Sequence, residues 1–208
     1  MPLIRKETAT TTGSAPSGPD DLLSPNSETR WAAVRHLAKD TANAGALGKA
    51  LTAESDPRVR EALFTGLAQM RTSEAIMQIV PHIRSQDAAV RAGALDALSA
   101  MPEAVESQLP ALLSDPDPDV RLLVCDVVRR LPGPAATRYL CDLLAQETLA
   151  NVCGAAVEAL SEVGDETALP VLTDCAARFH AEPFLVFSIK VASSRIAGDG
   201  RMFSPKAP

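Results

Sequence analysis

A short pattern returns in this chain about every thirty residues. Each copy opens on an aspartate, has a valine three residues later and an arginine directly after it. The three clearest copies are Asp56-Pro57-Arg58-Val59-Arg60, Asp87-Ala88-Ala89-Val90-Arg91 and Asp117-Pro118-Asp119-Val120-Arg121. A fixed period of this length is typical of repeat arrays, in which each unit contacts only its neighbours. The chain is therefore predicted to form a linear array, and no single stretch is expected to hold an active site.

Each unit carries two apolar segments with helical spacing, so each is predicted to be a pair of helices. Second helices are expected at 27–40, 57–70, 88–100, 118–131, 149–163 and 183–197. First helices are expected at 42–53, 72–85, 103–114, 135–146 and 166–180. No segment alternates as a strand does. The predicted fold is an all-α, right-handed α-solenoid of about five to six two-helix units.

The ends of the chain differ in composition from the array. Residues 1–20 are rich in Thr, Ser, Gly and Pro and are predicted to be a disordered tail. The array is expected over residues 21–197, with a flexible tail at 198–208. Pro81, Pro110 and Pro170 occupy matching places in three first helices, which predicts a bend there.

Charge and cysteine content narrow the possible partners. A formal charge of -6 and a pI near 5.1 disfavour a nucleic-acid partner. No segment approaches the roughly 20 apolar residues that span a bilayer, and the first residues lack the apolar core of a signal peptide. Cys125, Cys141, Cys153 and Cys175 show no metal-type spacing, so buried thiols in a reducing cytoplasm are expected, with a redox or metal role as the alternative.

The Asp-Pro-x-Val-Arg turn, the Leu-Pro-x-Leu-Leu block of the preceding helix and the period together resemble HEAT repeats, specifically the short bacterial type named after phycobilisome lyases. The resemblance covers residues 21 to 197. It implies a non-enzymatic scaffold, adaptor or assembly factor that binds another protein. The alternative that it implies is an accessory subunit for cofactor attachment, similar to the bilin lyases. No catalytic, metal or cofactor-binding residues are predicted, because His36, His82 and His180 are not followed by the glutamates of iron-binding HEAT-like hydroxylases.

The resemblance also implies that the second helices line the concave surface, where a partner would bind. Helical spacing directs toward that surface the residues two, six and nine positions after a reference residue in each unit, which is Thr29, Val59, Val90, Val120 or Val152. The candidate partner-binding residues are Trp31, Arg35, Glu61, Asp96, Asp126, Arg129 and Glu158. The acidic row of Asp96, Asp126 and Glu158 suits a basic or amphipathic segment, and an ordinary solvated face is the alternative.

Two features at the ends of the array leave alternatives open. Trp31, the only tryptophan, is either an exposed binding anchor or a cap that folds under the N-terminal tail. The last helix is apolar on every side, so Phe184, Leu185 and Phe187 are predicted to form a C-terminal interface. A homodimer through this helix, a partner protein or the 198–208 tail would cover it.

Overall fold

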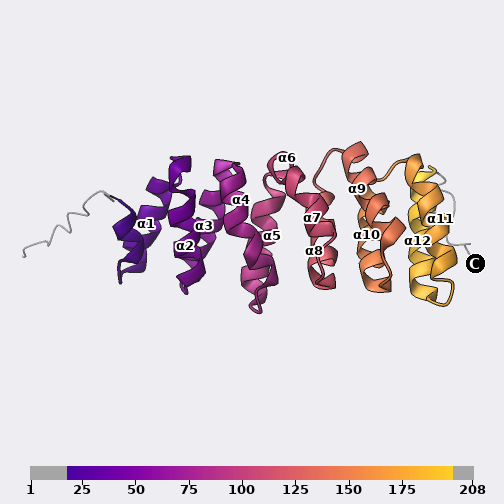
Figure 1. Cartoon of the computed structure of the whole chain (residues 1–208), viewed down its shortest axis with the longest axis horizontal. Helices are drawn as coiled ribbons and strands as arrows, with labels where there is room; N and C mark the ends of the chain where they lie inside the picture. Colours follow the sequence, from indigo (N-terminus) through magenta and orange to yellow (C-terminus); the bar gives the residue numbers. More distant parts are fainter. Residues whose placement is uncertain (1–17, 199–208) are drawn as a thin grey trace, which may run out of the picture.

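The fold is that of a computed structural model, described here for residues 18–198. The predictions for residues 1–17 and 199–208 lie outside these described residues. Figure 1 shows one elongated row of helix pairs whose order along the long axis follows the sequence. The first and last described helices therefore lie at opposite ends of the row. This arrangement confirms the predicted α-solenoid.

The described residues contain helices and no strand. The second helices are α1 (Ser27–Leu37), α3 (Pro57–Met70), α5 (Ala88–Ser99), α8 (Pro118–Val128), α10 (Ala150–Val163) and α12 (Pro183–Ile196). The first helices are α2 (Ala44–Ala53), α4 (Ser73–Ile79), α6 (Pro102–Val105) with α7 (Leu109–Leu113), α9 (Gly133–Gln146) and α11 (Leu169–Arg178). Short 3-10 helices adjoin them: η1 (Pro19–Leu23), η2 (Thr41–Asn43), η3 (Val80–Arg84), η4 (Glu106–Gln108) and η5 (Glu166–Ala168).

The repeated acidic or amide residue explains where the second helices begin. In the first four units a side-chain oxygen accepts a hydrogen bond from the backbone N–H two residues later, at 2.8–3.0 Å; the capping residues are Asn26, Asp56, Asp87 and Asp117. Such a cap satisfies an N–H that the helix itself leaves unpaired. Leu149 stands at the equivalent place before α10 and provides no side-chain cap.

The core runs along the array as a layer between first and second helices. Successive second helices contact one another, as do successive first helices. The position eight residues after the reference is buried in all five units, in Leu37, Leu67, Leu98, Val128 and Leu160. The helices approach closely where the Phe64 ring packs on Gly93, since a Cβ at Gly93 would lie 2.7 Å from that ring. Aliphatic packing between neighbouring units therefore holds the array together.

The three matched prolines each lie at a change of helix type. α4 becomes the 3-10 helix η3 just before Pro81. Pro110 and Pro170 occupy the first turn of α7 and α11, each directly after a 3-10 segment. A proline lacks the N–H that an α-helix interior needs, so the helix is interrupted or restarted there. α2 and α9, which have Gly48 and Cys141 at the equivalent place, are uninterrupted α-helices.

The array begins earlier than the sequence predicts. Pro19 and Asp20, assigned to the disordered tail, belong to η1. Proline is favoured in a first helical turn, and η1 contacts both α1 and α2 through a segment in which Leu22 is buried. η1 thus completes the partial first unit.

Shortening a core side chain should destabilise the array far more than shortening an exposed one. Leu98 is fully buried in α5, so Leu98→Ala is expected to lower the free energy of unfolding by about 2–5 kcal/mol. Leu23 is exposed in η1, so Leu23→Ala is expected to change it by no more than about 0.5 kcal/mol. Urea denaturation followed by circular dichroism measures both. Equal losses in the two variants would contradict this description of the core.

Candidate functional site

The arginines that follow the reference residues, Arg30, Arg60, Arg91 and Arg121, bind groups of the array itself. Arg30, Arg91 and Arg121 each donate a hydrogen bond to the backbone carbonyl six residues earlier, at 2.7–2.9 Å. Arg30 and Arg121 also make two hydrogen bonds to a carboxylate in the next unit, Glu54 and Glu147 respectively. These guanidinium groups connect neighbouring units and leave little capacity for a ligand.

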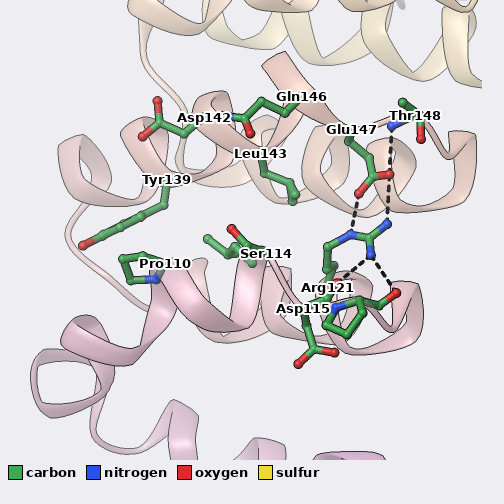
Figure 2. A pocket seen from close by; sticks show the side chains of 12 residues that line it. Pro110, Ser114, Asp115, Arg121, Tyr139, Asp142, Leu143, Gln146, Glu147 and Thr148 are labelled. Atoms are coloured by element: carbon green, nitrogen blue, oxygen red, sulfur yellow. Dashed lines mark hydrogen bonds and ion pairs between the residues drawn. The ribbon is translucent and has the colours of Figure 1, made fainter.

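Figure 2 shows one such connection, with the guanidinium of Arg121 directed at the carboxylate of Glu147. The Glu147 side chain is only 3% exposed. Burial alone would raise the pKa of Glu147, but hydrogen bonds from Arg121 and from two backbone N–H groups lower the pKa on balance. A pocket of about 510 Å³ lies beside the pair, between α7 and α9. The charged groups at the centre of this pocket, Arg121 and Glu147, already bind each other, so we assign the pocket a structural role.

The aspartates nearest to these arginines in the sequence are mostly not their ion-pair partners. These aspartates are Asp56, Asp87, Asp115 and Asp117. Among the four aligned arginines only Arg60 forms an ion pair with one of these aspartates, Asp87, at 3.8 Å. Three of the four aspartates, Asp87 among them, cap helices, and the fourth, Asp115, pairs with Arg84. The glutamates that bind Arg30 and Arg121 come from the following unit, which a local pattern does not reveal.

The second helices form a common face on which most of the predicted residues are exposed. We call it the second-helix face. Its exposed charged residues from the prediction are Arg35, Glu61, Asp96, Asp126 and Glu158, one from each of the first five second helices. Asp96 and Glu158 form no ion pair with any residue from 18 to 198, whereas Asp126 pairs with Arg129. Two carboxylates of the acidic row are therefore available to a cationic ligand.

Arg129 is less available than the sequence predicts. Its guanidinium binds Asp126 at 3.0 Å and Glu162 at 2.9 Å. Arg129 lies nine residues after the reference residue, where the side chain is directed at the neighbouring helix α10, and it is about three-quarters buried. Arg129 thus links α8 to α10 and contributes little free positive charge to the face.

Trp31 lies in a groove between α1 and α3 at the start of the second-helix face. The groove has a volume of about 490 Å³, and we call it the N-terminal groove. The guanidinium groups of Arg35 and Arg58 lie 4.7 and 4.6 Å from the Trp31 ring centroid, a distance at which a cation attracts the ring. The ring packs against the core and is only partly buried. It therefore keeps a surface that a ligand can contact.

The groove between α3 and α5, the middle groove, has a volume of about 670 Å³. Glu61 and Asp96 line it together with Arg60 and Arg71. The two cations and two carboxylates balance each other. Phe64 forms part of its floor and is buried.

A third groove, the C-terminal groove, lies between α10 and α12 and has a volume of about 730 Å³. Its lining is largely apolar, with two carboxylates, Glu158 and Glu182. Phe184 and Phe187 line it and remain 81% and 56% exposed. Two phenylalanines so exposed on one groove wall are unusual for a surface that faces only water.

Leu185, named with Phe184 and Phe187 for the C-terminal interface, is buried, and α12 is not apolar on every side. Leu185 is 3% exposed and belongs to the core with Ile189 and Ala192, because α12 directs one helical face at α10 and α11. Lys190 and Arg195 provide exposed charge elsewhere on the helix. The uncovered apolar surface is therefore confined to the part of α12 that carries Phe184 and Phe187. Phe187 and Leu185 differ by two positions, which on a helix places them on different faces.

Three charged residues of the two end grooves were not predicted as binding residues from the sequence. Arg58 and Lys39 line the N-terminal groove, and Glu182 lines the C-terminal groove. Arg58 precedes Glu61 and Ala62 by three and four residues, a helical spacing that places all three on one face. Lys39 lies within the helix predicted at 27–40, four residues after Arg35, so the same spacing could have identified it. Glu182 lies outside the helices, where helical spacing gives no information.

The cysteines are free thiols; Cys125, Cys153 and Cys175 are buried and Cys141 is half-buried. Burial raises the pKa of Cys125 to about 12 and that of Cys141 to about 11. A hydrogen bond between Cys153 and Cys175 lowers the pKa of Cys175 and raises that of Cys153. Within residues 18–198 no three Cys, His, Asp or Glu side chains converge as metal ligands would.

The described part of the chain also contains no helix with the length and apolar character needed to cross a membrane.

Helix pairs stacked in one row, each contacting the next, define a helical-repeat solenoid. Comparison with known families agrees: residues 21–99, 44–114 and 105–182 each match HEAT repeats. Because these matches together span most of the chain, the protein belongs to the HEAT-repeat family.

Comparison with solved structures finds designed proteins of low sequence identity. A designed armadillo repeat protein in complex with the peptide (KR)4 is 17% identical, with a TM-score of 0.44, over 88% of this chain and 99% of that chain. An engineered protein of known crystal structure is 21% identical, with a TM-score of 0.42, over 88% of this chain and 96% of that chain. Comparison with curated proteins returned no match.

Proposed function

We propose that this HEAT-repeat protein is a non-enzymatic scaffold, an adaptor or assembly factor, that holds a basic or amphipathic segment of another protein on its second-helix face. The C-terminal groove carries the proposal. Phe184 and Phe187 offer apolar surface to a partner, and Glu158 and Glu182 lie beside them. An amphipathic segment with cationic residues matches both features, because its apolar side chains would cover the rings and its cations would meet the carboxylates.

The available acidic groups support the same partner chemistry. Neither Glu158 nor Glu182 forms an ion pair with a residue of the described range. Asp96, further along the face, forms no such ion pair either. No cation of the described residues pairs with these carboxylates, so none has to be displaced when a partner binds. Acidic groups of this kind favour association with a positively charged segment.

Reversing the charge of Asp96, Asp126 and Glu158 together to lysine is expected to weaken partner binding about tenfold or more, since each exposed charge pair contributes about 0.2–1 kcal/mol and reversal adds repulsion. The free energy of unfolding should change little, apart from the loss of the Asp126–Arg129 pair. Isothermal titration calorimetry with the natural partner, alongside urea denaturation, measures the two effects. Unchanged affinity in a folded triple variant would place the binding site elsewhere.

Three narrower interpretations from the sequence, the type of repeat, the location and the homodimer, are part of this proposal. The phycobilisome-lyase-like type of HEAT repeat rests on the Asp-Pro-x-Val-Arg and Leu-Pro-x-Leu-Leu motifs, and a cytoplasmic location rests on the composition. A homodimer would place a second copy of this chain against Phe184 and Phe187. The accessory role in cofactor attachment has no separate observation in the grooves to support it, so we place the scaffold role first.

A further inference from the structure

The charge of the second-helix face changes sign from one end to the other. The N-terminal groove has three cations, Arg35, Lys39 and Arg58, and one carboxylate, Glu61. The middle groove is balanced, and the C-terminal groove has two carboxylates and no cation. A single face with opposite charge at its two ends distinguishes the two ends of a bound segment.

From this gradient we infer that the face binds one extended segment in a fixed orientation, with its acidic end at Trp31 and its basic, apolar end at Phe184 and Phe187. The inference rests on the proposed function and adds a second contact region to it. It also assigns a role to Trp31, as an aromatic contact for the acidic end.

The cations of the N-terminal groove are free to bind a carboxylate. Arg35 and Lys39 form no ion pair with any residue of the described range. Arg58 pairs with Glu28 at 2.8 Å, but both side chains are more than half exposed, so a ligand carboxylate can replace Glu28 at little cost. Arg35 and Arg58 both lie against the Trp31 ring, which holds the two guanidinium groups over the same groove.

The length of the face sets the length of the segment. The N-terminal and C-terminal grooves are four second-helix steps apart, and packed helices lie about 8–10 Å apart. The span is then roughly 32–40 Å, which an extended chain covers with about 10–12 residues. A short acidic motif or a short basic motif alone would contact only one end.

Trp31 makes the orientation measurable, because it is the only tryptophan in the chain. The probe is a synthetic peptide of about 14 residues, with Asp and Glu at one end, Arg, Lys, Leu and Phe at the other and a Gly-Ser-Thr middle. A dansyl group, which accepts energy from tryptophan, is attached to either end in two otherwise identical peptides. We expect the label at the acidic end to quench Trp31 emission more strongly than the label at the basic end. Equal quenching, or stronger quenching from the basic end, would overturn the orientation.

Replacing two cations of the N-terminal groove with glutamate provides the matched control for the orientation. Arg35→Glu with Arg58→Glu is expected to weaken binding of this peptide about three- to tenfold. The same double variant should bind a peptide with lysines at both ends more tightly than the unaltered protein does. Loss of affinity for both peptides would contradict the inference.

Phe184→Ser with Phe187→Ser separates the inference from the proposed function. If the serine substitutions weaken peptide binding but the substitutions at Arg35 and Arg58 do not, the orientation is overturned and the proposed function stands. If neither pair of substitutions weakens binding, the orientation and the proposed function are both contradicted. If each pair weakens binding and the quenching is as expected, the orientation and the proposed function are both supported.

Discussion

Replacing Arg121 with methionine is expected to lower the free energy of unfolding by about 3–5 kcal/mol, because it leaves the Glu147 carboxylate buried without its partner. The Arg121 side chain is 14% exposed, and its guanidinium lies 2.7 Å from a Glu147 oxygen. Methionine preserves most of the apolar stem, so the loss is chiefly electrostatic. Urea denaturation at neutral pH measures it.

The effect of this substitution should depend on pH in a defined direction. The pKa of Glu147 is lowered in the folded protein, so the pair stabilises the fold above the unfolded carboxyl pKa of about 4.3, and this contribution is lost as pH falls through the folded-state pKa. In the variant, burial without Arg121 should raise the pKa of Glu147, and protonation then relieves the unpaired charge. The difference between the two proteins is therefore expected to narrow as the pH falls from about 7 to about 4.

An exposed ion pair is the control for this prediction. Arg138 pairs with Glu106 at 3.4 Å, and the Arg138 side chain is 61% exposed. Arg138→Met is expected to cost only about 0–1 kcal/mol. If the two methionine variants lost the same stability, the Arg121–Glu147 connection would not be a structural element of the array.

Replacing Phe184 and Phe187 together with serine is expected to weaken partner binding about a hundredfold or more, since truncating one anchoring aromatic residue costs about 2 kcal/mol or more. Stability should change by less than about 1 kcal/mol, because both rings are largely exposed. Titration calorimetry with the natural partner measures the affinity. Light scattering of both proteins shows whether that partner is a second copy of the chain, in which case the wild type is a dimer and the variant a monomer.

Met77 provides the matched control. It is another exposed, large apolar residue, but it lies on the first helix α4. Met77→Ser is expected to leave affinity unchanged within about twofold, since it lies outside the second-helix face. A comparable loss of affinity in this variant would show that general surface hydrophobicity, and not the C-terminal groove, drives binding.

The second helices were predicted closely because their signals are local. An aspartate or asparagine cap and apolar residues at helical spacing lie within one helix, and α3 begins and ends where predicted, at Pro57 and Met70. The predicted bounds of the first helices were less exact. The segment predicted as one helix at 103–114 is α6, η4 and α7. It is interrupted one turn before Pro110, which has no N–H to donate to the carbonyl four residues earlier.

The exposed rows of the candidate site were also predictable, because helical spacing alone places Arg35, Asp96 and Glu158 on one face. Contacts between units were not. Glu147 lies 26 residues from Arg121, and Leu185 turns inward because of its contacts with other helices. The three grooves are likewise formed by neighbouring units, so the full set of charges that lines each groove becomes visible only in the structure.

Site-specific photocrosslinking in the native host identifies the surface that the partner contacts. A photoreactive amino acid is placed in turn at Thr65 and Glu158 on the second-helix face and at Met77 on α4. We expect the same protein to be crosslinked from Thr65 and from Glu158 but not from Met77. Crosslinks to that protein from Met77 alone would contradict the claim that the second-helix face is the binding surface.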